Sequence, residues 1–182
     1  DITFYVTNDQ VYKYNFKNED HLENVKITYL PLHSEKFVKE AQKMNRQELD
    51  IPVNAIISAS TNMWKSSFGD TEFFFDMIKD LILENRNYHH IFAGTSRCLD
   101  NLRVYINKYP FLEKNIHFIG EVKNIYSLLK TIDFFINSFP TSGGSDIEAA
   151  YVGKPTIEFI HSRNLTLHPT EFLSSRECIV TN

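Results

Sequence analysis

The stretch of residues 132–159 limits the fold of this chain more than any other, because it predicts a strand, a loop, a short helix, a turn and a second strand in succession around a pair of glycines. It starts with a short apolar run, which is typical of a strand buried on both faces of a parallel sheet. Turn-forming residues follow at 138–144, and then a short helical segment that Ser142 or Ser145 can cap. Gly153-Lys154-Pro155 ends this helix before the next apolar run.

The glycine pair in this stretch indicates where a ligand would bind. A strand that opens through Gly143 and Gly144 into a helix directs free backbone N–H groups and the positive end of the helix dipole at one place, which suits phosphate. Glycines also let a ligand approach the backbone closely. Because two glycines before a helix are also common in plain turns, the loop alone leaves both interpretations open.

The same alternation of strand and helix runs through most of the chain. Strands are predicted at 53–58, 88–93, 115–119, 132–136 and 156–160, with a further candidate at 177–180. Helices are predicted at 34–47, from Asp70 or Thr71 onward, at 97–108, at 123–130 and after the glycine pair. This spacing predicts right-handed βαβ units and therefore an α/β fold with a doubly wound, mainly parallel Rossmann-like sheet.

The first 32 residues follow a different pattern of three short β-like runs, at 2–6, 11–16 and 25–30, between polar turns. They predict a small hairpin-like patch or the end of a preceding domain. We therefore expect a linker or domain remnant at 1–45 and a ligand-binding domain at 46–182. Since the chain starts without Met inside a strand-like run, and stops just after another apolar run, we expect it to be a piece of a longer protein.

Composition argues against several classes of function. The net charge of −4 gives no electrostatic reason to expect nucleic acid or an anionic membrane as a partner, and no apolar run could span a bilayer. Cys98 and Cys178 are too few for a disulfide framework, which favours a reducing cytoplasm. His89 and His90 share one predicted strand, where alternation sends one side chain inward and the other outward, so we expect no metal site there.

Ligands of open parallel sheets bind beyond the carboxyl ends of the strands. The loops predicted at that edge combine glycines with cations, and they cover residues 59–65, 94–97, 120–123 and 141–146. This combination suits a negatively charged ligand with a planar part. Neither a dinucleotide-binding Gly-x-Gly-x-x-Gly after a strand nor a P-loop motif is present, which argues against those two kinds of nucleotide site.

Two charged residues are candidates for contact with such a ligand. Lys65 follows the first predicted core strand, so its ammonium group could reach phosphates at the rim, although most lysines in such places are simply solvated. Glu148 lies one turn inside the helix after the glycine pair. A carboxylate there stabilises any helix by about 0.5 kcal/mol, but it is also placed like the acidic residue that accepts ribose hydroxyls in nucleotide sites.

Three patches of sequence together indicate a family, through both their residues and their order along the chain: RQELDIP at 46–52, NMWK at 62–65 and PTSGGSDIEAAYVGKP at 140–155. Together they resemble the C-terminal, donor-binding domain of GT-B glycosyltransferases. The resemblance is nearest to the branch that includes O-linked N-acetylglucosamine transferase and related bacterial enzymes, and it covers residues 46–180. The first 32 residues match nothing in that family.

The resemblance implies a role for each residue of the candidate site. Lys65, in one loop with Asn62, would contact the donor diphosphate and stabilise the leaving group. Backbone or hydroxyl donors to the diphosphate would come from Ser142, Gly143, Gly144, Ser145 and Asp146. Glu148 would hold the ribose. The base would be met, largely through backbone groups, by the loop that contains Gly120, Val122 and Lys123.

The implied activity is transfer of a hexose-type sugar from a nucleoside-diphosphate sugar, with a UDP-sugar as the expected donor, to an unknown protein or glycan. No further cofactor and no metal would be required, since a lysine and helix amides stabilise the charge on the leaving diphosphate. Many retaining members carry a second glutamate eight residues before the one at Glu148, where this chain has Pro140, which favours an inverting mechanism. The acceptor and the general base would belong to a preceding domain, so we expect nucleotide binding without turnover by this chain alone.

Two other functions fit the same features. A nucleotide-sugar epimerase of the same two-domain fold would need acid–base carboxylates and histidines in the cleft, and the sequence offers no convincing set. A non-catalytic nucleotide-sugar-binding subunit of a transferase could retain Lys65 and Glu148. For the transferase, we expect a cytoplasmic location, with peripheral association with the inner membrane left open.

Overall fold

A computed structural model describes residues 4–6, 25–27, 35–61, 71–94, 99–137 and 144–157 of the chain. Its main body is a five-stranded, fully parallel sheet in the order β5-β4-β3-β6-β7. The strands are β3 (Ile56–Thr61), β4 (Tyr88–Ala93), β5 (Ile116–Gly120), β6 (Phe134–Ile136) and β7 (Thr156–Ile157). The predicted fold class, a doubly wound parallel α/β sheet, is confirmed.

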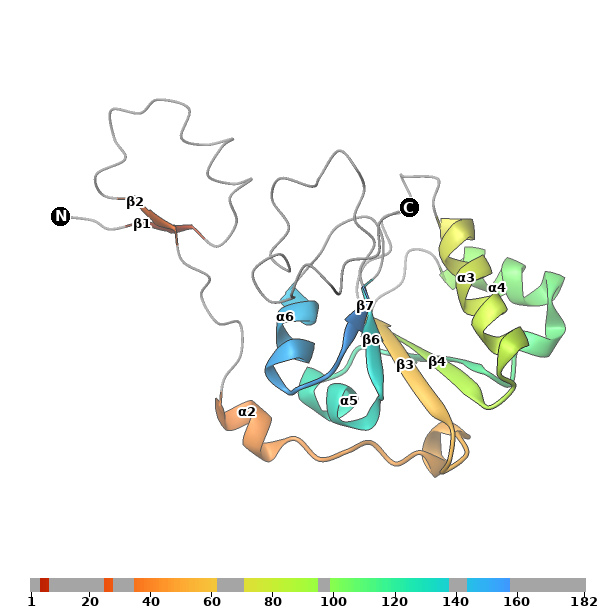
Figure 1. Cartoon of the computed structure of the whole chain (residues 1–182), viewed down its shortest axis with the longest axis horizontal. Coiled ribbons are helices and arrows are strands. Elements are labelled where there is room, and N and C mark those ends of the chain that lie inside the picture. The colour runs from red at the N-terminus through yellow and green to blue at the C-terminus, as the bar shows by residue number, and fades with distance from the viewer. Residues whose placement is uncertain are drawn as a thin grey trace.

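Helices cover both faces of this sheet (Figure 1). On one face lie α3 (Thr71–Glu84) and α4 (Leu99–Lys108), and on the other lie α5 (Ile125–Thr131) and α6 (Gly144–Tyr151). Short 3-10 turns occur at η2 (Gln47–Leu49) and η4 (Pro110–Leu112). Because β3 is followed outward by β4 and β5, whereas β6 returns to its other side, the strand order reverses between β3 and β6.

The two faces of the sheet carry two separate apolar cores. One core packs β-strand residues such as Ile57 and Phe135 against α5 and α6, and the other packs Phe92 and Ile136 against α3 and α4. Our prediction that one of His89 and His90 would point outward is wrong, since they are 5% and 0% exposed. Alternation sends them to opposite faces, but helices cover both faces, so both side chains are buried.

The first core strand begins three residues later than predicted, at Ile56 instead of Val53. Val53 is 88% exposed and lies in a turn that the N–H of Ala55 closes by donating to the Pro52 carbonyl at 3.1 Å. The Arg46 guanidinium holds this turn by donating to the carbonyls of Val53 at 2.7 Å and Ala55 at 3.2 Å. Because the carbonyls of residues 52, 53 and 55 already accept these hydrogen bonds, this segment forms a turn and the strand begins after it.

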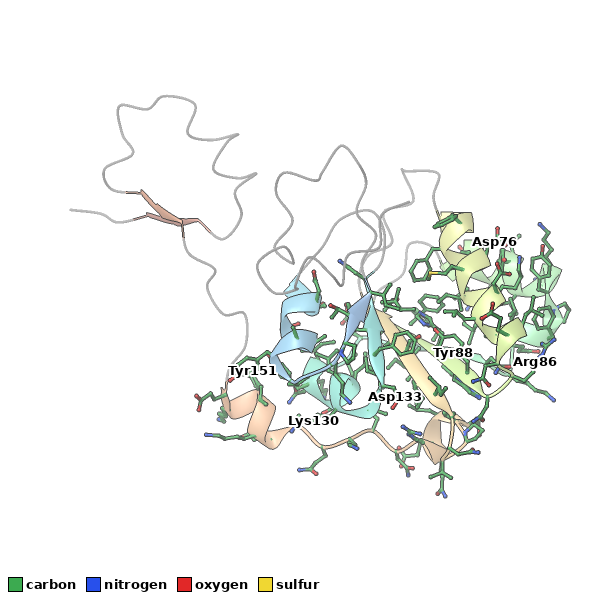
Figure 2. All side chains as sticks on the ribbon, viewed as in Figure 1. Asp76, Arg86, Tyr88, Lys130, Asp133 and Tyr151 are labelled. Carbon is green, nitrogen blue, oxygen red and sulfur yellow. The ribbon has the colours of Figure 1, made fainter. Side chains whose placement is uncertain are left out.

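The predicted helix at 34–47 is also shorter, because α2 spans only Glu35–Glu40. Asn124, which precedes α5, and Lys130 of α5 (labelled in Figure 2) satisfy carbonyls near its end. Asn124 Nδ2 donates to Phe37 at 2.9 Å, and Lys130 Nζ donates to Val38 at 2.6 Å and Ala41 at 3.0 Å. These contacts let the chain leave the helix and run along α5. The domain boundary at residue 46 stays a prediction.

The N-terminal part contains a two-stranded sheet of β1 (Phe4–Val6) and β2 (Val25–Ile27). The two strands pair in parallel, with Phe4 opposite Val25, so the hairpin-like arrangement that we predicted is wrong. Two parallel strands need a crossover connection, whereas a hairpin is antiparallel. The predicted runs at 11–16 and 177–180 lie outside the described residues.

Candidate nucleotide-binding site

The carboxyl ends of β3 and β6 lie side by side at the centre of the sheet. Ser58 is opposite Phe134 and Ala59 is opposite Phe135, and the Ser60 hydroxyl donates to the Ile136 carbonyl at 2.7 Å. The strand order reverses between these two strands, and ligands of open α/β sheets bind at such a reversal, beyond the carboxyl ends. The reversal of strand order thus places the expected ligand site beyond β3 and β6, and binding of a ligand there stays a prediction.

Four of the predicted site residues belong to segments that follow these two strands. Asn62 and Lys65 come after β3, and Ser142 and Gly143 come between β6 and α6. All four lie outside the described residues, so their roles stay predictions. The strands that lead to them are parallel neighbours, which starts both segments from the same edge of the sheet.

The helix that follows β6 begins at Gly144, as expected for a helix start that faces the crevice. Ser145 therefore lies inside the first turn. Of the two serines that we considered as caps of this helix, Ser145 is thus excluded. Asp146, also in the first turn, is 1% exposed. The N–H groups of the first helical turn have no partners inside a helix, so those of Gly144, Ser145 and Asp146 are the candidate donors to an anion.

The same helix ends at Gly153, as the sequence predicted. Gly153 has a φ of +72°, its N–H donates to the Ala150 carbonyl at 2.9 Å, and the Lys154 N–H donates to the Ala149 carbonyl at 2.9 Å. These two bonds form a Schellman motif, in which glycine takes the left-handed conformation without strain. The short helix is thus fixed at its carboxyl end, which holds its first turn at the edge of the sheet.

Glu148 lies on this helix with its side chain half-buried. Burial raises the pKa of its carboxyl above the ordinary value. No hydrogen bond or ion pair to this carboxylate occurs within the described part of the chain. A partly desolvated carboxylate with free acceptor sites suits hydroxyl groups of a ligand.

The loop after β5 starts at the same edge of the sheet, two strands away from β3. Gly120 has a φ of +69° and its carbonyl accepts from the Gly94 N–H at 2.7 Å, which ties the loop to the end of β4. Val122 is half-buried and packs against a core cluster, whereas Lys123 is exposed. This cluster includes Ala149, which follows Glu148 in the sequence. Val122 of the predicted base loop and Ala149, the neighbour of the predicted ribose residue, thus contribute to the same apolar core.

Sequence reasoning missed one residue of this region, Tyr126. The Asn124 side chain caps α5 by accepting from the Tyr126 N–H at 3.0 Å. This cap puts Tyr126, 2% exposed, in the first turn directly after the base loop. Burial, followed by the charge of Glu148 and then Tyr151, raises the pKa of its hydroxyl to about 12. An aromatic hydroxyl in the first turn after a ligand loop is the sequence signal that could have found it.

A second polar cluster lies away from this edge, close to where the strands begin. His89 Nδ1 and His117 Nε2 are 2.9 Å apart, and their rings stack with centroids 5.2 Å apart. Across the residues that the structure describes, no three or more His, Cys, Asp or Glu side chains are grouped to hold a metal ion. Within the same residues, no helix is long and apolar enough to cross a membrane.

Comparison with known proteins gives matches at the level of structure. No protein family matches the chain, and no curated protein matches its sequence. Anabaena HepE in complex with UDP and glucose matches with a TM-score of 0.61 and 17% identity, over 86% of this chain and 44% of its own. WaaG, a glycosyltransferase involved in lipopolysaccharide biosynthesis, matches with 0.58 and 16% identity, over 84% and 42%. The complex of S. aureus MnaA with UDP matches with 0.63 and 16%, over 94% and 44%.

The chain has the Rossmann-like fold of GT-B glycosyltransferases. The chain spans less than half of the length of each of the three matched proteins. Two of the three structures contain UDP. The nearer resemblance to the branch of O-linked N-acetylglucosamine transferase stays a prediction.

Proposed function

We propose that this chain is the donor-binding half of a glycosyltransferase, and that it binds a nucleoside-diphosphate sugar, with UDP as the nucleotide, beyond the carboxyl ends of β3 and β6. The observation that carries the proposal is the reversal of strand order at these two strands, next to which α6 begins and presents Glu148 without a partner in the described chain. UDP in the matched HepE and MnaA structures supports the choice of nucleotide.

Each part of the donor would have its own set of contacts. Lys65 and Asn62, from the segment after β3, would approach the diphosphate from one side. Amide and hydroxyl groups at the start of α6 would approach it from the other, namely those of Ser142, Gly143, Gly144, Ser145 and Asp146. Glu148 would accept hydrogen bonds from the ribose hydroxyls. Backbone groups of Gly120, Val122 and Lys123 would meet the base.

The chemistry of this site would be electrostatic. When the bond between the sugar and the diphosphate breaks, negative charge develops on the leaving diphosphate, and the Lys65 ammonium and the helix amides stabilise that charge. No metal is needed for this step. Pro140, in place of a second glutamate, favours inversion at the sugar carbon.

The acceptor, a protein or a glycan, and the general base would belong to a second domain. This proposal is supported by the length of the matched structures, of which the chain covers 44% or less. The chain alone would therefore bind nucleotide without transferring sugar. Measurable transfer by the 182-residue chain would contradict this arrangement.

A second candidate function is epimerisation of a nucleotide sugar. It is favoured by the match to a UDP-N-acetylglucosamine 2-epimerase, with a TM-score of 0.55 and 14% identity. Both enzymes would bind the nucleotide in the same crevice, so they differ in the product. Incubation of UDP-N-acetylglucosamine with the longest natural form of the protein distinguishes them, because an epimerase converts it without an acceptor. Nucleotide-sugar binding without either reaction in that form would indicate a non-catalytic subunit.

Calorimetric titration of the chain with UDP, GDP, ADP and CDP tests the proposed site. Lys65→Ala and Glu148→Ala should each weaken UDP binding by about 1.5–3 kcal/mol, since each removes a charge-assisted contact. Lys114→Ala and Glu113→Ala are matched controls, because both side chains are exposed in the turn before β5, at the opposite edge of the sheet. Unchanged affinity in both site variants would overturn the site, and no binding of any of the four nucleotides would overturn the function.

A further inference from the structure

Among the described residues, the hydroxyl of Tyr126 is a buried polar group that has no hydrogen-bond partner. The residue is 2% exposed, and its Oη makes no hydrogen bond within the described part of the chain. A hydroxyl that is removed from water without a hydrogen bond costs free energy, and a phenyl ring would fill the same space without that cost. The hydroxyl therefore calls for a partner that is not in place.

The carboxylate of Glu148 is a candidate for that partner, because its charge acts on the Tyr126 hydroxyl and the helices that carry the two residues pack together. Tyr126 belongs to the same core cluster as Ala149, which follows Glu148 on α6, and α5 and α6 are packed together. The charge of Glu148 acts on the Tyr126 hydroxyl and helps to raise its pKa to about 12, after burial and ahead of Tyr151. The hydroxyl thus keeps its proton at neutral pH. It can therefore interact favourably with the Glu148 carboxylate only by donating a hydrogen bond to it.

Both groups adjoin the proposed nucleotide site. Tyr126 lies in the first turn of α5, three residues after the loop that would meet the base, and Glu148 lies where the ribose is proposed to bind. The Glu148 side chain is half-buried and has no hydrogen bond of its own within the described residues, so nothing there fixes its rotamer. A carboxylate that must accept two neighbouring ribose hydroxyls needs such a fixed orientation.

We propose that Tyr126 is a positioning residue, whose hydroxyl donates to the Glu148 carboxylate when a ribonucleotide binds and directs its remaining acceptor sites at the 2′- and 3′-hydroxyls of the ribose. The inference rests on the proposed function. The inference has one consequence beyond that function. Tyr126 contributes to the selection of a ribonucleotide over a 2′-deoxyribonucleotide, although Tyr126 contacts neither nucleotide.

The test compares UDP with 2′-deoxy-UDP on four forms of the 182-residue chain: unaltered, Tyr126→Phe, Glu148→Gln and the double variant. Calorimetry should show that Tyr126→Phe weakens UDP binding about 5–10-fold and 2′-deoxy-UDP binding less than about twofold, because the lost bond is to an ionised acceptor. The double variant should bind UDP as weakly as Glu148→Gln alone, since Tyr126 acts through Glu148. Tyr126→Phe should leave the thermal midpoint unchanged or raise it, because no existing hydrogen bond is lost.

Tyr88→Phe is the control for a merely structural hydroxyl. Tyr88 is also buried, but its hydroxyl bonds with the Ser58 hydroxyl on the opposite face of the sheet, so the control should lower the midpoint and leave the ratio of the two affinities unchanged. Equal weakening of both nucleotides by Tyr126→Phe, additive effects in the double variant, or a midpoint lowered as in Tyr88→Phe would overturn the inference.

Failure of the inference can be told apart from failure of the proposed function. If UDP binds the unaltered chain and is weakened by Glu148→Gln but not by Tyr126→Phe, only the role of Tyr126 is refuted. If UDP does not bind the unaltered chain, both are refuted.

Discussion

The Asp133 carboxylate accepts a hydrogen bond from the N–H of Ile57 at 2.8 Å, and the N–H of Asp133 donates to the Ile57 carbonyl at 2.7 Å. Asp133 precedes β6, and Ile57 is a fully buried residue of β3, so the double contact sets the register of the two central strands (Figure 2). Since the proposed donor site lies where these strands end, the position of its two sides depends on this register.

Replacement of Asp133 should therefore destabilise the sheet. In Asp133→Ala the N–H of Ile57 loses its acceptor, and we expect a loss of about 1–3 kcal/mol in the free energy of unfolding. Asp133→Asn retains an acceptor oxygen and should lose less. Urea unfolding followed by circular dichroism measures both, with the exposed Asp100→Ala as the control. A loss in Asp133→Ala no larger than in the control would show that the bond to Ile57 contributes nothing.

A second prediction concerns the contact between α3 and α4. The Tyr105 hydroxyl donates to the Asp76 carboxylate, and Lys79 Nζ lies 2.6 Å from the same carboxylate. The bond from Lys79, followed by that from Tyr105, holds the pKa of the Asp76 carboxyl below its ordinary value. Removal of the buried donor in Tyr105→Phe should cost about 1–2 kcal/mol of unfolding free energy.

Tyr109→Phe is the matched control for this variant, because Tyr109 belongs to the same cluster of aromatic rings. Its ring contacts Lys79 and Lys108 by cation–π interactions that a phenyl ring would keep, so its stability should change little. Chemical denaturation of both variants at neutral pH makes the comparison. Equal losses in the two variants would show that removal of either hydroxyl has the same effect and that the bond with Asp76 contributes nothing specific.

A third prediction concerns acid stability and the histidines of β4 and β5. Burial lowers the pKa of His90 to about 3, with the charge of His117 as the smaller cause, and burial also lowers the pKa of His89. For His117, burial and then the charge of His89 lower the pKa to about 4, against the opposite effect of Asp50. All three are therefore neutral in the folded chain at pH values where the unfolded chain, with an ordinary pKa of about 6.5, is already protonated.

The sign of the effect follows from this difference. The unfolded state binds more protons as the pH falls, so the full stability is present above about pH 6.5 and is lost progressively between there and about pH 4, and further toward pH 3 for His90. For the partly exposed His117, we expect a loss of about 1–2 kcal/mol between pH 7 and 5, after allowance for solvent screening. Urea unfolding at pH 7, 6 and 5 measures this slope. His117→Gln should flatten it, and an equal slope in this variant would contradict the assignment.

The parts of the fold that sequence reasoning recovered are those that depend on local patterns. The largely apolar β4, the helical spacing of α3 and the glycine that ends α6 are each encoded within one short segment, so periodicity and backbone preference suffice. Parallel strand pairing then follows from the alternation of strands and helices. The crevice at the reversal of strand order could be predicted in the same way.

The parts that it missed depend on partners far away in the chain. The end of α2 is set by Asn124 and Lys130, which lie 87 to 92 residues beyond the carbonyls that they satisfy. Burial of both His89 and His90 requires helices on both faces, and no residue of β4 itself reveals that. The sequence could have indicated the position of Tyr126 after a ligand loop, but the lack of a partner for its hydroxyl among the described residues is a property of its surroundings. The roles of Lys65 and its loop stay predictions for experiment.

The last prediction concerns two glycines in the left-handed conformation, Gly120 in the proposed base loop and Gly153 after the end of α6. Gly120 and Gly153 have φ angles of +69° and +72°, and an added Cβ would meet no atom within 4 Å at either position. Gly120→Ala and Gly153→Ala should therefore cost similar amounts, about 1–2 kcal/mol, from backbone strain alone. They should differ in ligand binding, because Gly120 belongs to the proposed base loop, whereas Gly153 ends α6 away from it. Thermal unfolding and UDP titration of both variants make the test, and equal weakening of UDP binding would argue against a role of the Gly120 loop in meeting the base.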